Sequence, residues 1–143
     1  MKIRKANEQD YDRIAELYKQ GFSEGPYNEP WTLDKALDKL KLFLKYCDIY
    51  VAVDDDKIIG FVIANPNHWC PGEVIFGEEI VVDNKYRRKG VAKKLTNYIE
   101  EKYKEKGFKL VMTIINKKAN SYQLTKSLGF IESKSNIIME KKL

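Results

Sequence analysis

A short basic turn joins an apolar segment to an amphipathic one near the middle of the chain. Residues 74–82 form an apolar run that is interrupted only by Gly77 and the pair Glu78-Glu79. Hydrophobic residues then recur every three or four positions from Val91 to Tyr103, which predicts one face of a helix. The order strand, basic turn, helix constrains the fold more than any other feature of the sequence.

The turn itself combines a glycine with many cations. Gly90 allows the backbone to approach an anion without a side chain in the way. A helix N-terminus also presents unpaired N–H groups and a partial positive charge, which suit a phosphate. The cations around this turn are Arg87, Arg88, Lys89, Lys93 and Lys94. A phosphate site and a solvated basic helix start are the two interpretations of this turn taken alone.

Length and composition bound the class of protein. The 143 residues suffice for one domain with its own core. No apolar run reaches the roughly 18 residues of a membrane span, and no signal segment opens the chain. Cys47 and Cys70 show neither zinc-like spacing nor a disulfide framework. We therefore expect one cytoplasmic domain over residues 1–143, with no metal and no membrane partner.

The charges are distributed unevenly. Residues 1–83 hold 10 Lys and Arg against 16 Asp and Glu, whereas residues 84–143 hold 16 against 5. One half would attract a cation and the other an anion. This suits an enzyme that joins a polyanionic cosubstrate to an amine, and it would also suit a nucleic-acid-binding module. Because the cations concentrate at one glycine turn and no groove-reading motif appears, we expect no nucleic-acid partner.

The other segments alternate between strand and helix patterns. Asn7 and Thr32 are expected to cap the first two helices, and the last long helix to stop at Gly107. Strands are expected at residues 2–5, 49–53, 58–64, 74–82 and 110–115, a short helix at 119–128, and one or two closing strands around 137–139. This order predicts a mixed α/β (α+β) domain.

The basic turn resembles the acyl-CoA pyrophosphate loop of the GNAT superfamily of N-acyltransferases. That loop usually reads Gln or Arg, two residues, Gly, one residue, then Gly or Ala. Arg87, Gly90 and Ala92 hold these positions, after a strand that ends Val-Asp-x-x-Tyr. The expected order of elements also matches this family. The resemblance implies a central mixed, mostly antiparallel sheet flanked by about four helices and splayed between its fourth and fifth strands.

The resemblance also implies acetyl-CoA as cosubstrate. Its pantetheine arm would lie in the gap between the splayed strands and pair with the main chain of Ile80 and Val82. Asn120 would lie near the pantetheine as well. The pyrophosphate would be held by the turn, whose implied contacts are Arg87, Arg88, Lys89, Gly90, Val91 and Ala92.

Two adjacent carboxylates are candidates for the general base. Side chains alternate along a strand, so we expect one of Glu78 and Glu79 to face the cleft and the other to face the opposite layer. The resemblance favours Glu78, nine residues before Arg87, where many family members hold a carboxylate. For both residues the alternative is a strand-face glutamate paired with a lysine.

A second family segment departs from the usual pattern. It normally reads Ala-x-x-Leu-Tyr-x-x-x-Gly-Phe, in which the Tyr protonates the coenzyme thiolate. Residues 121–130 align with it, but Thr125 takes the place of the Tyr. Tyr122 lies three residues earlier, on roughly the same helical face, and is the substitute candidate. The alternatives are a packing role for Tyr122 and a thiolate that leaves without an acid.

Aromatic and acidic residues in two loops are the candidates for the amine pocket. They are Tyr27, Glu29, Trp31 and Trp69, which suit an amine by charge attraction and cation–π contact and would equally suit packing. The lone histidine, His68, is expected to be a surface residue. The sequence thus predicts transfer of an acetyl group to a primary amine of a small molecule, amino acid or peptide N-terminus by direct attack on the thioester. A non-catalytic acyl-CoA sensor is the alternative, and a homodimer is possible.

Overall fold

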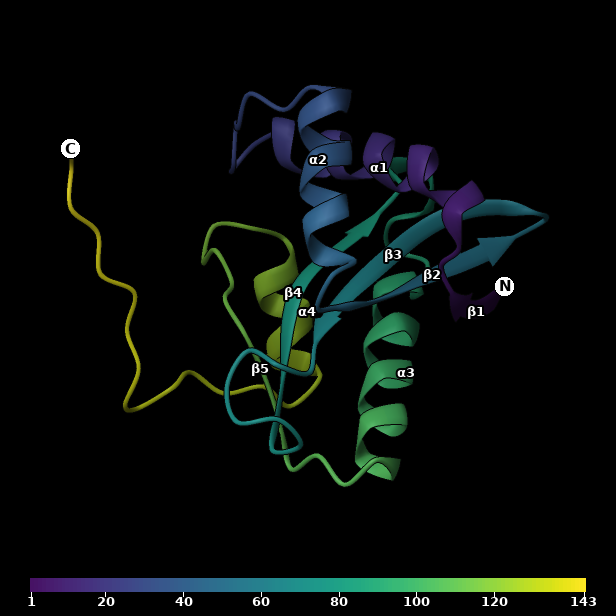
Figure 1. Cartoon of the computed structure of the whole chain (residues 1–143). Coiled ribbons are helices and arrows are strands. Elements are labelled where there is room, and N and C mark those ends of the chain that lie inside the picture. Colours follow the sequence, from purple (N-terminus) through teal and green to yellow (C-terminus); the bar gives the residue numbers. More distant parts are fainter.

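The apolar segments of the sequence pair into one five-stranded sheet with the order β1-β2-β3-β4-β5 (Figure 1). This computed structural model describes all 143 residues. The strands are β1 (Lys2–Lys5), β2 (Asp48–Asp54), β3 (Lys57–Asn65), β4 (Val74–Val82) and β5 (Leu110–Thr113). The first four are antiparallel neighbours, and β5 is parallel to β4. The expected mixed, mostly antiparallel sheet is confirmed.

Four α-helices and two short 3-10 turns complete the fold. Their bounds are η1 (Glu8–Asp10), α1 (Tyr11–Ser23), α2 (Leu33–Phe43), η2 (Asn84–Tyr86), α3 (Val91–Glu105) and α4 (Ser121–Ser127). Asn7 forms the capping box with Asp10, and the Thr32 side chain accepts from the N–H of Lys35. Neither the length nor the hydropathy of any helix suffices to cross a membrane.

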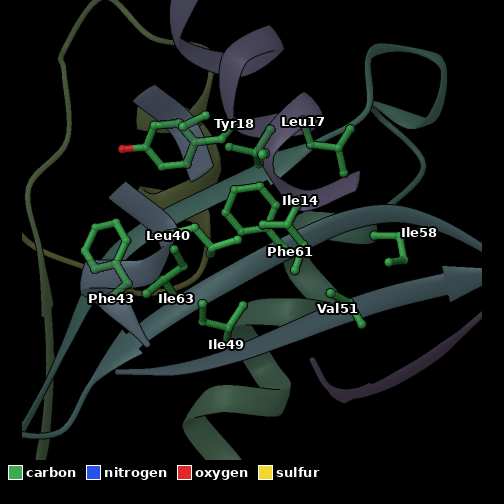
Figure 2. Close-up of a cluster of buried hydrophobic side chains, with 13 residues drawn as sticks. Ile14, Leu17, Tyr18, Leu40, Phe43, Ile49, Val51, Ile58, Phe61 and Ile63 are labelled. Carbon is green, nitrogen blue, oxygen red and sulfur yellow. The ribbon is translucent and has the colours of Figure 1, made fainter. Parts of the chain in front are cut away.

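Each face of the sheet carries its own apolar core. On one face, α1 and α2 pack over alternate residues of β2 and β3 (Figure 2), including Val51, Phe61 and Ile63. On the other face, α3 places Leu95 and Ile99 over the intervening residues of the same strands. Strand β3 is therefore buried on both sides, which explains why its sequence is continuously apolar.

Helix α1 approaches strand β4 closely because the helix carries a glycine at the contact. A Cβ at Gly21 would lie 2.9 Å from Cγ1 of Val81 on β4. The same approach brings Tyr18, one turn earlier on α1, over Phe61 with 6.2 Å between ring centroids. The tight contact between α1 and β4 positions this side of the candidate site.

The closing strands expected around residues 137–139 are absent, so this expectation was wrong. Residues 128–143 contain no strand, and β5 is the edge of the sheet. Ile137, Ile138 and Met139 are 83%, 63% and 86% exposed. The segment is apolar, as a strand would be, but a strand also needs a neighbour for its main-chain groups, and none lies beside this segment.

We predict that Phe61→Ala lowers the free energy of unfolding by about 3–5 kcal/mol, because Phe61 is fully buried and touches the core under α1. The matched control is Leu42→Ala on α2, whose side chain is 49% exposed and whose loss we expect to cost about 0.5 kcal/mol or less. Urea unfolding of both variants checks the difference. Equal losses would show that the core does not centre on β3.

Candidate active site

The sheet forks where β4 continues beyond its neighbour β5. The two strands pair only from Val74 to Gly77 on β4. At the fork the Thr113 hydroxyl donates to the carbonyl oxygen of Gly77 at 2.9 Å. From Glu78 to Val82, the edge of β4 that faces away from β3 has no strand beside it. The splay expected between the fourth and fifth strands is therefore present.

Main-chain groups of two residues point into this fork. The N–H of Asp83 donates to the carbonyl of Ile59 on β3 at 2.9 Å, which fixes that pair as a hydrogen-bonded one. Hydrogen-bonded and non-bonded pairs alternate along antiparallel strands, so Ile80 and Val82 direct their main-chain groups away from β3. Consistent with this, Nε of Arg87 donates to the Val82 carbonyl at 3.3 Å. These two residues thus offer donors and acceptors to an extended ligand.

The basic turn ends at a helix start with free N–H groups. Gly90 caps α3 in the left-handed conformation, with φ of 79°, and a Cβ there would meet nothing within 4 Å. The first N–H of the helix with a main-chain partner is that of Lys94, which donates to Gly90. The N–H groups of Val91 and Ala92 therefore point out of the helix end, where its dipole is positive.

A buried carboxylate holds the beginning of this turn. Asp83 is 7% exposed, accepts from the N–H of Lys85 at 2.9 Å and is ion-paired with the Arg13 guanidinium from α1. Burial opposes ionisation of Asp83, but the Lys85 N–H and Arg13 outweigh it and hold its pKa below the ordinary value. The turn between β4 and α3 is thereby tied to α1.

Both candidate carboxylates lie on the same face of the sheet, because β4 bulges at this point. Ile63 pairs with Glu79 and Ala64 pairs with Gly77, which leaves Glu78 as the extra residue. An added residue breaks the alternation of side chains. The expectation that Glu78 and Glu79 face opposite layers was therefore wrong, and both side chains lie on the side of α1 and α2.

Glu78 is held by a buried amide. Asn65, 4% exposed, donates from Nδ2 to Oε1 of Glu78 at 2.7 Å, and its Oδ1 accepts from the N–H of Asn67. Nδ1 of His68 lies 3.9 Å from the same Glu78 oxygen, and the His68 ring stacks on Phe76 with 4.0 Å between centroids. These contacts orient the Glu78 carboxylate.

Glu79 lies deeper, against α1. The Tyr18 hydroxyl donates to Oε1 of Glu79 at 2.9 Å. Burial raises the pKa of Glu79 to about 7, although the hydrogen bond from Tyr18 opposes the shift and the charge of Glu78 adds to it. A carboxyl with this pKa is present in both protonation states near neutral pH.

The four residues expected to form the amine pocket are distributed over two loops. Trp31 packs edge-on against Tyr18 with 4.8 Å between ring centroids, and its indole N–H donates to Glu29 at 2.6 Å. Tyr27 packs on Phe22 at the start of the same loop. Through these three contacts, the group of aromatic and acidic side chains extends from the Tyr18–Glu79 pair into the loop between α1 and α2.

Trp69 belongs to the loop on the opposite side of the two carboxylates. It is 46% exposed and lies 5.4 Å from the ring of His68, centroid to centroid. The stretch of acidic and aromatic side chains on this face therefore runs from Glu29 to Trp69, with Glu78 and Glu79 between them.

The polar side chains of α4 make hydrogen bonds away from Glu78 and Glu79. The Tyr122 hydroxyl donates to Glu132 at 2.6 Å, and the Thr125 hydroxyl donates to the Ser121 carbonyl one turn earlier. Asn120 is exposed and makes no side-chain capping bond. No contact joins these residues to Glu78 or Glu79, so the structure does not bring the expected acid beside the expected base.

Three residues of the site were missed in the sequence. Tyr18 belongs to an apolar helical stripe, and Asn65 was assigned to the start of a loop, so neither carried a polar signal of its own. The sequence around Arg13 does not indicate its partner Asp83, which lies 70 positions away. No group of three or more His, Cys, Asp or Glu side chains is placed to hold a metal ion.

Solved structures share this fold. A possible acetyltransferase from Clostridium difficile 630 is 22% identical, with 99% of this chain and 97% of that chain covered and a TM-score of 0.82. AAC(6')-Iy, in complex with the bisubstrate analog CoA-S-monomethyl-acetylneamine, is 25% identical, with 99% and 98% covered and a TM-score of 0.77. The aminoglycoside antibiotic 6'-N-acetyltransferase AAC(6')-IG from Acinetobacter haemolyticus is 25% identical, with 100% and 99% covered and a TM-score of 0.76.

Sequence comparison identifies the family directly. No curated protein sequence matches the chain. The sequence profile described as the Acetyltransferase (GNAT) family matches residues 11–130, from the first residue of α1 to the phenylalanine after α4. This match includes the forked strand, the basic turn and both carboxylates. The chain belongs to the GNAT family of acetyltransferases.

Proposed function

We propose that this protein transfers an acetyl group from acetyl-CoA to a primary amine. The observation that carries the proposal is the arrangement along β4. The strand offers an open main-chain edge at Ile80 and Val82, leads into the N–H groups of the basic turn, and presents Glu78 and Glu79 beside them. One strand thus holds groups for a long polyanionic cosubstrate and for a cationic acceptor.

The residues of the turn fit the pyrophosphate of acetyl-CoA. The space over Gly90 is open, the N–H groups of Val91 and Ala92 lack partners within the chain, and Arg87, Arg88 and Lys89 supply charge. Ile80 and Val82 would pair with the amides of the pantetheine arm, and Asn120 would lie farther along the gap. When bound, acetyl-CoA supplies an acetyl group activated as a thioester.

The carboxylates of β4 would prepare the amine for attack. An ammonium must lose a proton before its nitrogen can form a bond to the acetyl carbon. We assign the acceptance of this proton to Glu78, because Asn65 orients its carboxylate and its side chain is 20% exposed. Glu79 adds a second, titrating negative charge that attracts the ammonium and holds it beside Glu78.

The thiolate would leave without an acid that is already in position. Thr125 replaces the family tyrosine, and its hydroxyl is engaged within α4. Tyr122 stays the candidate donor, provided that its hydroxyl exchanges Glu132 for the coenzyme sulfur. Holding the two reactants side by side would supply much of the rate in either case, since well-oriented reactants gain on the order of 7–11 kcal/mol.

Small molecules with several amino groups are the first acceptors to assay. The solved structures that are 25% identical include aminoglycoside N-acetyltransferases. Glu29 and the rings of Trp31, Tyr27 and Trp69 extend the acidic face beyond the two carboxylates, which suits a ligand with more than one positive charge. Amino acids and peptide N-termini form the remaining acceptor classes. A sensor that binds acyl-CoA without turnover is the second candidate, favoured by the engaged hydroxyls of Thr125 and Tyr122.

We predict that acetyl-CoA at a hundred times its dissociation constant adds about 2.7 kcal/mol to the stability of the protein. Gly90→Val should abolish this gain, because its side chain fills the space over the free N–H groups. Gly107→Val is the matched control, since Gly107 has a similar positive φ of 89° at the other end of α3. Thermal unfolding with and without the ligand checks both variants. If both variants lost the stability gain from acetyl-CoA equally, the assignment of the turn as the pyrophosphate site would be rejected.

We predict that Glu78→Gln lowers kcat/KM for the best amine by about 100-fold to 10,000-fold, the usual effect of removing a general base. Glu79→Gln, its neighbour on the same face, should cost less and should change the dependence of rate on pH near 7. Steady-state rates of thiol release across pH check both. Full activity of Glu78→Gln with an unchanged pH profile would show that Glu78 is not the general base. Tight binding of acetyl-CoA without thiol release for any amine would instead support the non-catalytic sensor.

The pKa of Glu79 also predicts how stability depends on pH. The folded protein keeps a proton on Glu79 up to about pH 7, whereas the unfolded chain releases it near 4.5, so this group lowers stability as the pH rises through that window. Glu79→Gln cannot titrate, and its amide oxygen still accepts from Tyr18. As the pH rises from 4.5 to about 7, the free energy of unfolding of the variant should therefore increase relative to that of the wild type by up to about 3 kcal/mol. Urea unfolding at both ends of the window checks this, and a constant difference would contradict it.

A further inference from the structure

Helix α2 covers the face of the sheet that carries the two glutamates, and one of its lysines has no polar partner. Lys35 donates to the carbonyl of Pro30, and Lys41 pairs with Asp38. Lys39 is half-buried, yet its ammonium forms neither a hydrogen bond nor an ion pair within the chain. Burial weakens the hydration of an ammonium, so such a group usually has a counter-ion. No direct contact compensates the charge of Lys39.

The packing of α2 directs the Lys39 ammonium toward Glu79. Its Nζ lies 4.8 Å from the centroid of the Phe43 ring, one turn farther along the helix. Phe43 and Ile63 belong to one core cluster, and Ile63 is the β3 residue that pairs with Glu79. Figure 2 shows the Phe43 ring at the same end of this cluster as the Tyr18 hydroxyl, which donates to Glu79. The stem of Lys39 therefore runs along α2 toward the end of the cluster where Glu79 lies.

The charge of Lys39 acts on the Glu79 carboxyl. Four charged or titratable side chains face this carboxyl from the elements packed around it, namely Tyr18 on α1, Lys39 on α2, Glu78 on β4 and Glu29 in the loop between α1 and α2. Burial is the largest influence and raises the pKa of Glu79, the Tyr18 hydrogen bond and Lys39 lower it, and the two glutamates add to the rise. Lys39 is the one cation in this group.

Opposite charges flank the two carboxylates along the length of α2. Glu29 precedes the start of the helix at Leu33 and accepts from the Trp31 indole N–H at 2.6 Å. Lys39 belongs to the second half of the same helix and points toward its end at Phe43. A cationic group bound beside the two carboxylates is therefore attracted toward the beginning of α2 and repelled from its end.

We propose that Lys39 is a specificity-determining residue, which directs a second positive group of the acceptor toward Glu29. The Lys39 ammonium holds the position near Glu79 that such a group otherwise takes. An acceptor with two cationic groups then binds with its reacting amine at Glu78 and its second group along Trp31 and Glu29, where a ring and a carboxylate both favour a cation. The inference rests on the proposed function, because it concerns the acceptor of that reaction.

Two acceptors of equal length test the proposal: a primary alkylamine that ends in a guanidinium, which always keeps its charge, and one that ends in a neutral amide. Rates are compared at about pH 9, above the pKa of about 7 of Glu79. Lys39→Met keeps an unbranched stem over Phe43 and should raise the ratio of kcat/KM, charged over neutral amine, about threefold, as for two unit charges a few ångströms apart in water. Glu29→Gln, whose amide oxygen still accepts from Trp31, should lower this ratio by a similar factor.

Lys41→Met is the matched control, because Lys41 is an exposed lysine of the same helix that pairs with Asp38. This variant should leave the ratio unchanged. An unchanged ratio in Lys39→Met, or an equal rise in Lys41→Met, would overturn the role of Lys39 and leave the acetyl transfer in place. If the wild type released no thiol with any amine, the proposed function would be rejected and the specificity with it.

A titration of the Glu79 carboxyl carbon followed by NMR needs neither acetyl-CoA nor an acceptor, and it separates the charge of Lys39 from its packing. Lys39→Met removes the one cation that acts on Glu79, so the titration midpoint should move to higher pH. Lys41→Met should leave the midpoint in place. Equal midpoints in the two variants would show that the charge of Lys39 does not act on this carboxyl, which would overturn the proposal.

Discussion

The site depends on one extra residue in β4. Because Glu78 is inserted opposite the junction of Ile63 and Ala64, two consecutive carboxylates lie on the face covered by α1 and α2. From Glu79 onward the pairing with β3 also fixes which main-chain groups of β4 point outward. The bulge thus places both acidic side chains on one face, and the main-chain groups of Ile80 and Val82 point toward the fork. A regular strand would separate the two glutamates by the thickness of the sheet.

Packing on the α1 side keeps these groups in place. Gly21 lets α1 rest on Val81, and Arg13 of the same helix pairs with the buried Asp83. Asp83 in turn bonds both β3, through its N–H, and the start of the basic turn, through its carboxylate. One helix therefore positions both the Tyr18–Glu79 pair and the turn, so the two halves of the site share a single rigid support rather than two independent loops.

The sequence predicted most of the fold because its signals are local. Capping at Thr32, the glycine at position 90 and the apolar run of β4 all appeared where they were expected, whereas Asn7 caps the short turn η1 that leads into α1. The bulge was not predictable, since it arises from the register with β3 and not from the residues of β4 alone. The closing strands predicted around residues 137–139 are absent for a related reason: the apolar residues indicate a strand, but no other strand lies beside this segment.

The distribution of charge would separate the two proposed reactants before either is bound. The acidic side chains gather on the α1 and α2 face, from Glu29 to the glutamates of β4, whereas the cations gather where α3 begins. An anion and a cation are thus attracted to different sides of the same strand and meet only along its open edge. The raised pKa of Glu79 refines this arrangement, because the second negative charge on the acceptor side develops only as the pH approaches about 7. A bound ammonium would favour the ionised form of Glu79, so in the proposed reaction the acceptor would itself promote loss of the Glu79 proton and strengthen the attraction between the amine and the two carboxylates.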